Sequence, residues 1–186
     1  MVWQVLYWSW VVSEVLIAIF TRTKRGENGN VQDRGTMLIL WLVIVASITA
    51  CQWISATHPH NIFGGAHWVR TMALLIMAIG LGIRWSAVFS LGKAFSANVA
   101  IRESQAINTS GLYAFVRHPS YLGLLLVFLA VGLHAQNWLS LAAAVAPTTA
   151  ALLYRIQVEE TALHAAFGDA YAAYCQRTKR LIPGLL

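Results

Sequence analysis

Long apolar blocks dominate this chain, and their lengths set the first structural expectation. A helix needs about 20 mostly apolar residues to cross the roughly 30 Å hydrocarbon core of a bilayer. The sequence contains apolar blocks at residues 2–20, 37–56, 68–91, 120–133 and 138–154. The pattern predicts an all-α integral membrane protein with about five transmembrane helices.

The polar links between these blocks refine that prediction. Only residues 134–137 separate the last two blocks, which predicts an antiparallel helical hairpin. The block 120–133 is short for a span, so its helix is expected to begin at or before His118. The polar stretch from Gly92 to Pro119 is too long for a tight turn.

The chain after the fifth block predicts a C-terminal amphipathic helical tail. Phe167, Tyr171 and Tyr174 are spaced four and three residues apart and would share one helical face. Gly168 followed by Asp169 is typical of a helix end followed by a new helix start, which favours two short helices over one.

Composition and charge indicate that this is a membrane protein and how it is oriented in the membrane. The chain is 58% hydrophobic and 11% charged, whereas about a quarter of the residues of a soluble domain are charged. Its net charge is +6, and the basic residues gather after the first, third and fifth blocks. Five spans place these clusters on one side, which predicts an external N-terminus and a cytoplasmic C-terminus. Topology thus explains the basic character, so nucleic acid is not an expected partner.

A first group of candidate residues precedes the fourth apolar block. Pro119 suits the first turn of a helix, which places Arg117 and His118 at the helix N-terminus. Cations gain nothing from the positive end of the helix dipole, so capping does not explain them. Together with free backbone N–H groups they would bind a carboxylate or phosphate. The alternative is that both side chains snorkel to the membrane interface.

A second group lies where the chain leaves the fifth block. Arg155 and Glu159 are four residues apart and can pair on one helix face, and Glu160 follows directly. Ionisable residues at membrane depth are costly and usually functional. The alternative is ordinary charge at the membrane interface.

Other polar residues give weaker signals. Glu14 and Arg84 lie within apolar blocks and could pair across helices or simply snorkel. Gly80 and Gly82 predict a close-packing spot between helices. The histidines of the second link have no carboxylate or thiolate partners, so no metal site is expected there; they are His58, His60 and His67. The chain has no strand followed by a Gly-rich turn, which excludes a Rossmann-type cofactor domain.

Taken together, the two groups resemble the isoprenylcysteine carboxyl methyltransferase family and its relatives, the small membrane phospholipid methyltransferases. The shared pattern is Arg-His-Pro-x-Tyr-x-Gly, an apolar hairpin, and then Glu-Glu. This chain has Arg117-His118-Pro119-Ser-Tyr121-Leu-Gly123 and Glu159-Glu160 at that separation. The resemblance covers residues 92–183, about half of the chain. Its flanking features are Gly111-Leu-Tyr113, Phe167-Gly168, Tyr171, Tyr174 and Leu181-Ile182-Pro183.

The resemblance implies a single transmembrane methyltransferase domain over residues 1–186, with three N-terminal helices in 1–91 and the cofactor-binding and catalytic half in 92–186. It implies S-adenosylmethionine as methyl donor, S-adenosylhomocysteine as product, and a lipophilic small-molecule or prenylated acceptor from the bilayer, without a metal. The residues implied at the acceptor are Arg155, Glu159 and Glu160. Those implied at the cofactor are Tyr113, Arg117, His118, Pro119, Tyr121, Gly123, Tyr171, Tyr174, Leu181, Ile182 and Pro183.

Elementary acid–base chemistry separates the two nearest acceptors. A carboxylate has an unperturbed pKa of about 3.5 and is already nucleophilic at neutral pH, so it needs a cation such as Arg155 to hold it. An ethanolamine headgroup must first lose a proton, and Arg155 would be an awkward neighbour for a cation. The Arg-Glu spacing favours the carboxylate. The open alternatives are a phospholipid N-methyltransferase, an NADPH-dependent enzyme resembling sterol reductases, and a non-enzymatic membrane scaffold.

Overall fold

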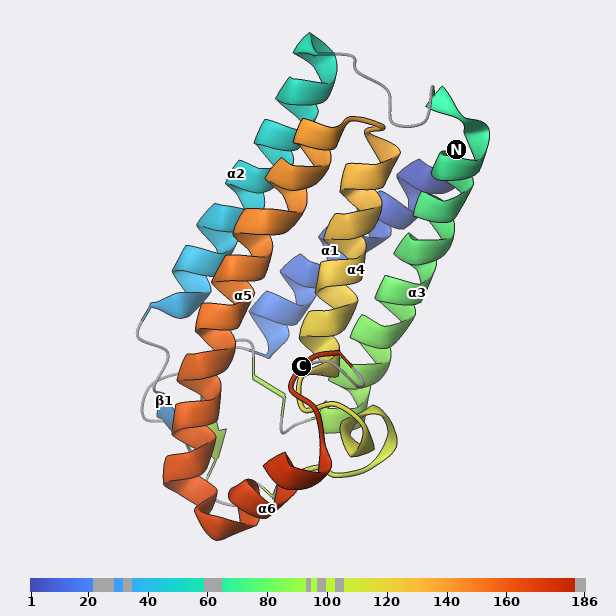
Figure 1. Cartoon of the computed structure of the whole chain (residues 1–186). Coiled ribbons are helices and arrows are strands. Elements are labelled where there is room, and N and C mark those ends of the chain that lie inside the picture. Colours follow the sequence, from blue (N-terminus) through green and yellow to red (C-terminus); the bar gives the residue numbers. More distant parts are fainter. Residues whose placement is uncertain are drawn as a thin grey trace.

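The computed structural model describes residues 1–21, 29–31, 35–58, 65–92, 95–96, 100–102 and 106–182. Five long helices form an up-and-down bundle (Figure 1). They are α1 (Val2–Phe20), α2 (Thr36–Thr57), α3 (His67–Leu91), α4 (Pro119–His134) and α5 (Trp138–Phe167). The short elements are β1 (Gly29–Val31), β2 (Ala100–Arg102), the 3₁₀ helix η3 (Gly111–Ala114) and α6 (Asp169–Arg177).

The bundle has the helices of a membrane protein, as predicted. Helices α1, α2, α3 and α5 are long and apolar enough to cross a bilayer, and α4 is a shorter apolar helix. Helix α4 begins at Pro119, with His118 as its N-cap, so the expected start at or before His118 is wrong by one residue. At 1.5 Å per residue its 16 residues span roughly 24 Å. It lies between α3 and α5, and much of it is buried, including Val127 and Phe128.

Helices α3 and α4 approach each other so closely that their backbones touch. A Cβ atom at Gly123 would lie 2.7 Å from both the Arg84 nitrogen and the Gly80 oxygen. A Cβ atom at Gly80 would in turn lie 2.9 Å from the Gly123 oxygen. The predicted close packing is therefore confirmed for Gly80. It is wrong for Gly82, where a Cβ would meet nothing within 4 Å.

The C-terminal part departs from its predicted layout. Helix α5 continues without a break for 30 residues, and Gly168, with φ 51°, ends it and caps α6. The break at Gly168 is confirmed, but Phe167 closes α5 whereas Tyr171 and Tyr174 lie on α6, so the expected shared face is wrong. Figure 1 shows α6 folded back beside the end of α5, from where the chain returns toward the start of α4.

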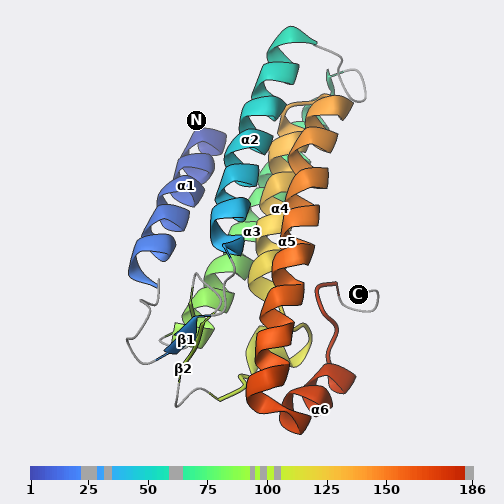
Figure 2. The same cartoon turned by 90° about the vertical axis from the view of Figure 1, so that its left-hand side faces the viewer.

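A small sheet was not predicted. Strands β1 and β2 pair antiparallel, with Asn30 opposite Ile101, at the same end of the bundle as α6 (Figures 1 and 2). Strands of three residues are too short to produce a recognisable alternation of apolar and polar positions, so they could not be predicted from the sequence.

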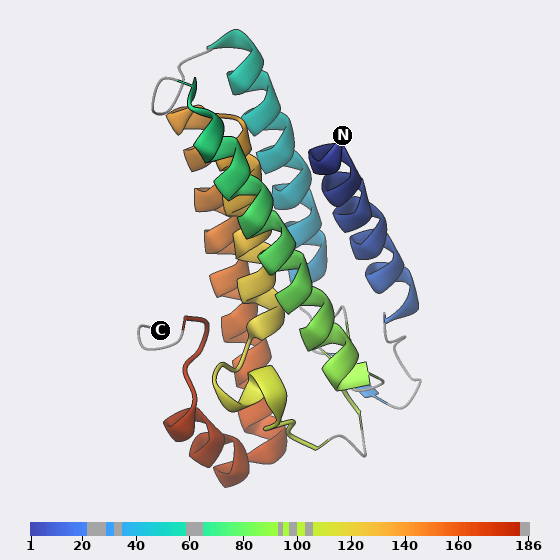
Figure 3. The ribbon, with the colours of Figure 1, turned by 90° about the vertical axis from the view of Figure 1, so that its right-hand side faces the viewer.

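Helix α1 stands at the edge of the bundle (Figures 2 and 3). Only Trp10 and Glu14 of this helix are buried. Trp10 packs edge-on against Phe128 of α4, with ring centroids 5.5 Å apart, and Trp3 stacks on His134 at 3.7 Å. The helix is thus attached along one narrow line, and most of its apolar surface faces outward, as a lipid-facing helix requires.

Candidate active site

A buried carboxylate joins three separate segments at one end of the bundle. Glu160 of α5 accepts a hydrogen bond from Arg117 Nε at 2.9 Å, and Arg180 Nη2 lies 2.7 Å from its other oxygen. His118 Nε2 lies 3.3 Å from Glu160 Oε1. The residue is 7% exposed, and a buried charge is tolerable only when it is paired. Glu160 therefore connects two segments to α5: the loop before α4, which carries Arg117 and His118, and the C-terminal tail, which carries Arg180.

Arg117 also holds the tail through backbone contacts. Its Nη1 donates to the carbonyl oxygens of Cys175 at 3.2 Å and Thr178 at 2.5 Å. Its backbone N–H donates to the Lys179 carbonyl at 2.8 Å. The tail runs parallel to the loop, with a bridge between Val116 and Lys179. Arg117 is thus neither a helix cap nor a snorkelling side chain but a tertiary crosslink.

A chain of hydrogen bonds through Tyr121 connects the predicted acceptor residues. Arg155 Nε donates to the Tyr121 hydroxyl at 3.0 Å, and this hydroxyl donates to Glu159 Oε2 at 2.8 Å. Arg155 Nη1 donates to Thr36 Oγ1 of α2 at 2.9 Å, and the residue is only 3% exposed. The Tyr121 ring is stacked on His118, with centroids 5.6 Å apart. The guanidinium is therefore fixed from α2, α4 and α5.

Three tyrosines surround the loop and the tail. Tyr174 donates its hydroxyl to the Tyr113 carbonyl at 2.7 Å, and Tyr113 donates to the Ala87 carbonyl at 3.3 Å. Burial raises the pKa of Tyr174 to about 12, against the opposing effect of Arg117, and burial also raises that of Tyr113. Tyr171 is buried, and its hydroxyl has no hydrogen-bond partner among the described residues. Tyr113 and Tyr174 are thus neutral hydrogen-bond donors at physiological pH.

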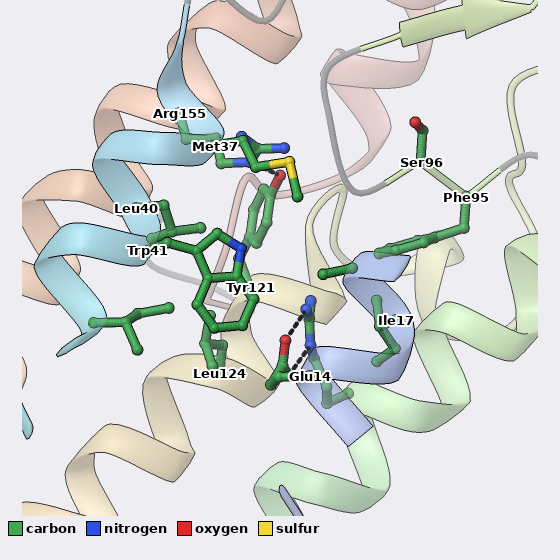
Figure 4. A pocket seen from close by; sticks show the side chains of 13 residues that line it. Glu14, Ile17, Met37, Leu40, Trp41, Phe95, Ser96, Tyr121, Leu124 and Arg155 are labelled. Carbon is green, nitrogen blue, oxygen red and sulfur yellow. Dashed lines mark hydrogen bonds and ion pairs between the residues drawn. The ribbon is translucent and has the colours of Figure 1, made fainter. Parts of the chain in front are cut away.

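A narrow pocket with a volume of about 40 Å³ opens beside Tyr121. Arg155 and Tyr121 lie at one end and the Glu14–Arg84 ion pair at the other, with Trp41 of α2 alongside (Figure 4). The remaining wall is mostly apolar and comes from α1, α2, α4 and the segment at 95–96; it consists of Ile17, Ala18, Met37, Leu40, Ile44, Leu124, Phe95 and Ser96. The pocket therefore combines an apolar body with Arg155 at one end and an ion pair at the other.

The structure brings most predicted site residues together at one end of the bundle. Pro119 occupies the first position of α4. Leu181 is buried, Ile182 is the last described residue, and Pro183 lies outside the described residues. Gly123 is different, because it faces α3 instead of the loop and the tail, and that contact explains the glycine without any ligand.

Sequence reasoning missed several polar residues of the site. Arg180 was explained by membrane topology alone, yet it pairs with Glu160. Thr36 and Ser120 carry no motif; they hold the two arginines of the pocket, Arg155 and Arg84 respectively. A buried arginine requires partners, but the sequence does not say which hydroxyl supplies them.

Comparison with known proteins gives consistent matches. The family model described as the isoprenylcysteine carboxyl methyltransferase (ICMT) family matches residues 72–165. A protein-S-isoprenylcysteine O-methyltransferase of Schizosaccharomyces pombe is 33% identical over 116 residues, covering 61% of this chain and 49% of that protein. A methanethiol S-methyltransferase of Bradyrhizobium diazoefficiens is 37% identical over 125 residues, covering 65% and 45%.

A solved structure, that of the eukaryotic intramembrane Ras methyltransferase ICMT, superimposes with a TM-score of 0.64 at 25% identity. The match covers 80% of this chain and 53% of that one. The chain thus spans about half the length of several relatives that it matches.

Proposed function

The chain belongs to the isoprenylcysteine carboxyl methyltransferase family, and we propose that it is an integral membrane methyltransferase that uses S-adenosylmethionine to methylate the carboxylate of an isoprenylcysteine-like lipophilic acceptor. The observation that carries this proposal is the Arg155–Tyr121–Glu159 chain, placed where the apolar pocket meets the polar residues around Glu160. An acceptor with an apolar body and an anionic head matches that arrangement.

The acceptor side is built to hold an anion without moving a proton. A carboxylate is already deprotonated near neutral pH, so the site needs to bind and orient it. Arg155 supplies a planar, two-pronged donor of the kind that binds carboxylates. Tyr121 and Thr36 fix that guanidinium in place, and Glu159 fixes the Tyr121 hydroxyl. The apolar wall excludes water from the bound head.

The methyl donor would be held on the other side of Tyr121, by the loop and the tail. S-adenosylmethionine supplies an electrophilic methyl group when it is bound. Its ribose, amino and carboxylate groups need polar partners, and its adenine needs a flat apolar surface. The buried hydroxyl of Tyr171 and the buried Nε of Arg180 have no partner among the described residues, which supports a polar ligand there. His118, Tyr113 and Tyr174 would add ring surface, and Leu181 and Ile182 an apolar edge.

The contacts of Glu160 support a different role from that of Glu159. Glu160 is engaged by Arg117, His118 and Arg180, whereas Glu159 is held by Tyr121 beside the pocket and its side chain is 32% exposed. In our proposal Glu160 positions the loop and the tail. The direct action on the acceptor that the sequence pattern implied for it stays an untested prediction.

The same proposal includes a sidedness and a domain organisation. The basic clusters would put the end of the bundle that carries α6 in the cytoplasm and the N-terminus outside. The chain would act as one domain, and its first half would not be a passive anchor, because Glu14 of α1 and Met37 of α2 line the acceptor pocket.

A second candidate is S-methylation of a thiol. It is favoured by the similarity to the methanethiol S-methyltransferase of Bradyrhizobium diazoefficiens. A thiol with a pKa of about 8.5 must lose its proton to become nucleophilic, and Glu159 would accept it, directly or through Tyr121. In this case Arg155 would stabilise the thiolate.

Two measurements on the detergent-purified protein test the proposal. Calorimetry with S-adenosylhomocysteine should show binding that His118→Ala weakens. Methyl transfer to an N-acetyl S-farnesylcysteine should give a base-labile methyl ester, and the matched amide of that acceptor should stay unmethylated. Methylation of methanethiol with no ester formed would favour the second candidate. A folded protein that neither binds S-adenosylhomocysteine nor transfers methyl to either acceptor would refute both.

A further inference from the structure

A second arginine is buried at the far end of the acceptor pocket. Arg84 of α3 donates to both oxygens of Glu14 of α1, from Nε and Nη2, each at 2.8 Å. The two residues are 6% and 7% exposed. Ionisable residues inside transmembrane helices are costly to place and are seldom kept without a function.

Arg84 makes a further contact that leads to the acceptor residues. Its Nη1 donates to Ser120 Oγ in the first turn of α4. Ser120 directly precedes Tyr121, whose hydroxyl links Arg155 to Glu159. The guanidinium also lies over the ring of Phe95, 5.9 Å from its centroid. One side chain therefore connects α1, α3 and the start of α4 at the wall of the pocket.

We propose that Arg84 is a positioning residue for the acceptor site, with Glu14 as its counter-ion inside the membrane. Resting on the proposed function, this assigns to Arg84 the task of fixing the first turn of α4 through Ser120. That turn sets where the Tyr121 hydroxyl lies between Arg155 and Glu159. Glu14 makes the arrangement possible, because an unpaired guanidinium would be too costly at this depth.

Simple attachment of α1 does not account for the network. Helix α1 is already attached by the Trp10–Phe128 and Trp3–His134 contacts, and Trp85 of α3 donates to Ser13 Oγ at 3.1 Å. A buried ion pair can often be replaced by apolar residues of similar volume with no loss of stability. If the Glu14–Arg84 pair only attached α1, apolar residues could replace it without loss of activity. If the pair also positions Ser120, the same replacement would lower activity.

This difference gives the test. The double variant Glu14→Leu/Arg84→Met removes both charges together, and Ser120→Ala removes only the link to α4. The matched control Trp85→Phe removes a hydrogen bond between the same two helices, one residue further along, that does not involve α4. Each protein is assayed for kcat and KM with the S-farnesylcysteine acceptor, for S-adenosylhomocysteine affinity, and for Tm.

We expect kcat of the double variant to fall by at most about 10-fold, because the network acts through the Tyr121 hydroxyl and a misplaced group lowers the rate. The affinity for S-adenosylhomocysteine should stay within about twofold of wild type, because the loop and tail contacts are not touched. Ser120→Ala should lower kcat in the wild-type background but not further in the double variant, because both changes break the same connection. Trp85→Phe should leave kcat unchanged.

A folded double variant with wild-type kcat and KM would overturn the inference, and so would independent, additive losses from Ser120→Ala. If the double variant does not fold, Ser120→Ala alone decides, because it leaves the ion pair intact. An inactive wild-type protein that does not bind S-adenosylhomocysteine would overturn the proposed function and this inference together. An active wild type with an equally active double variant would overturn the inference alone.

Discussion

The pocket contains two arginines in contrasting surroundings. Arg84 is held by both oxygens of Glu14, so its charge is matched by a carboxylate in the best geometry available. Arg155 donates to the hydroxyls of Tyr121 and Thr36, and the Tyr121 hydroxyl in turn donates to Glu159. Arg84 is therefore part of an ion pair between two membrane helices, whereas Arg155 is linked through Tyr121 to the other residue proposed to lie at the acceptor. The comparison indicates that the position and partners of an arginine, more than the residue type, separate the proposed binding residue Arg155 from the proposed positioning residue Arg84.

The largest effect is expected from removing Arg155, the proposed binding arginine. Arg155→Ala should reduce kcat by about 10²-fold to 10³-fold, the usual cost of deleting a donor aimed at the reacting group. Arg155→Lys should rescue little, since an ammonium cannot make the two-pronged contact. Steady-state methyl transfer measures the effect, and unchanged S-adenosylhomocysteine binding shows that the fold survives. Equal loss of turnover and of that binding would instead place Arg155 in the donor site.

The next largest effect is expected at Glu160. Glu160→Gln leaves Arg117, His118 and Arg180 without their shared carboxylate. We expect the free energy of unfolding to fall by about 3 kcal/mol, because removing one partner of a buried ion pair leaves the other charges unmatched. Faster proteolysis of the C-terminal tail and weaker S-adenosylhomocysteine binding would show this destabilisation. Loss of turnover with a stable tail and intact binding would instead assign Glu160 a direct role at the acceptor.

A third prediction concerns the helix contact that carries both Arg84 and Tyr121. Gly123→Ala places a methyl group 2.7 Å from the backbone of α3 and should destabilise the protein by about 1–3 kcal/mol. Gly82→Ala is the matched control, because a Cβ there meets nothing within 4 Å. Thermal unfolding in detergent should separate the two variants. Similar Tm values for both would contradict the close contact.

The smallest effect is expected from removing a single oxygen atom, the hydroxyl of Tyr121. Tyr121→Phe removes the hydroxyl between Arg155 and Glu159 while keeping the ring that stacks on His118. We expect kcat to fall about 10-fold, or about 1.4 kcal/mol, because the two hydrogen bonds that join the hydroxyl to Arg155 and Glu159 are lost. Acceptor KM should change less than kcat. A variant with wild-type kcat would show that Arg155 and Glu159 are placed without the hydroxyl.

The sequence by itself determined the membrane class, the five helices and the two polar groups of the site. The first helix was predicted at its observed bounds, and α2 and α3 to within one residue at each end. This succeeds because the length of an apolar block is a local property, fixed by the thickness of the bilayer. The Arg-His-Pro and Glu-Glu patterns are also local and could be read directly.

Tertiary structure alone decided the partners of the buried polar groups. Arg155 bonds to Thr36, 119 residues away, and of the two possibilities that the sequence left for Glu14 and Arg84 the ion pair, 70 residues apart, is the one that forms. The return of the tail to Val116 and the extension of α5 to Phe167 were likewise not predicted. A buried charge requires a partner, but several carboxylates and hydroxyls along the chain can satisfy it. Only the packing of the helices selects which one comes within hydrogen-bonding distance.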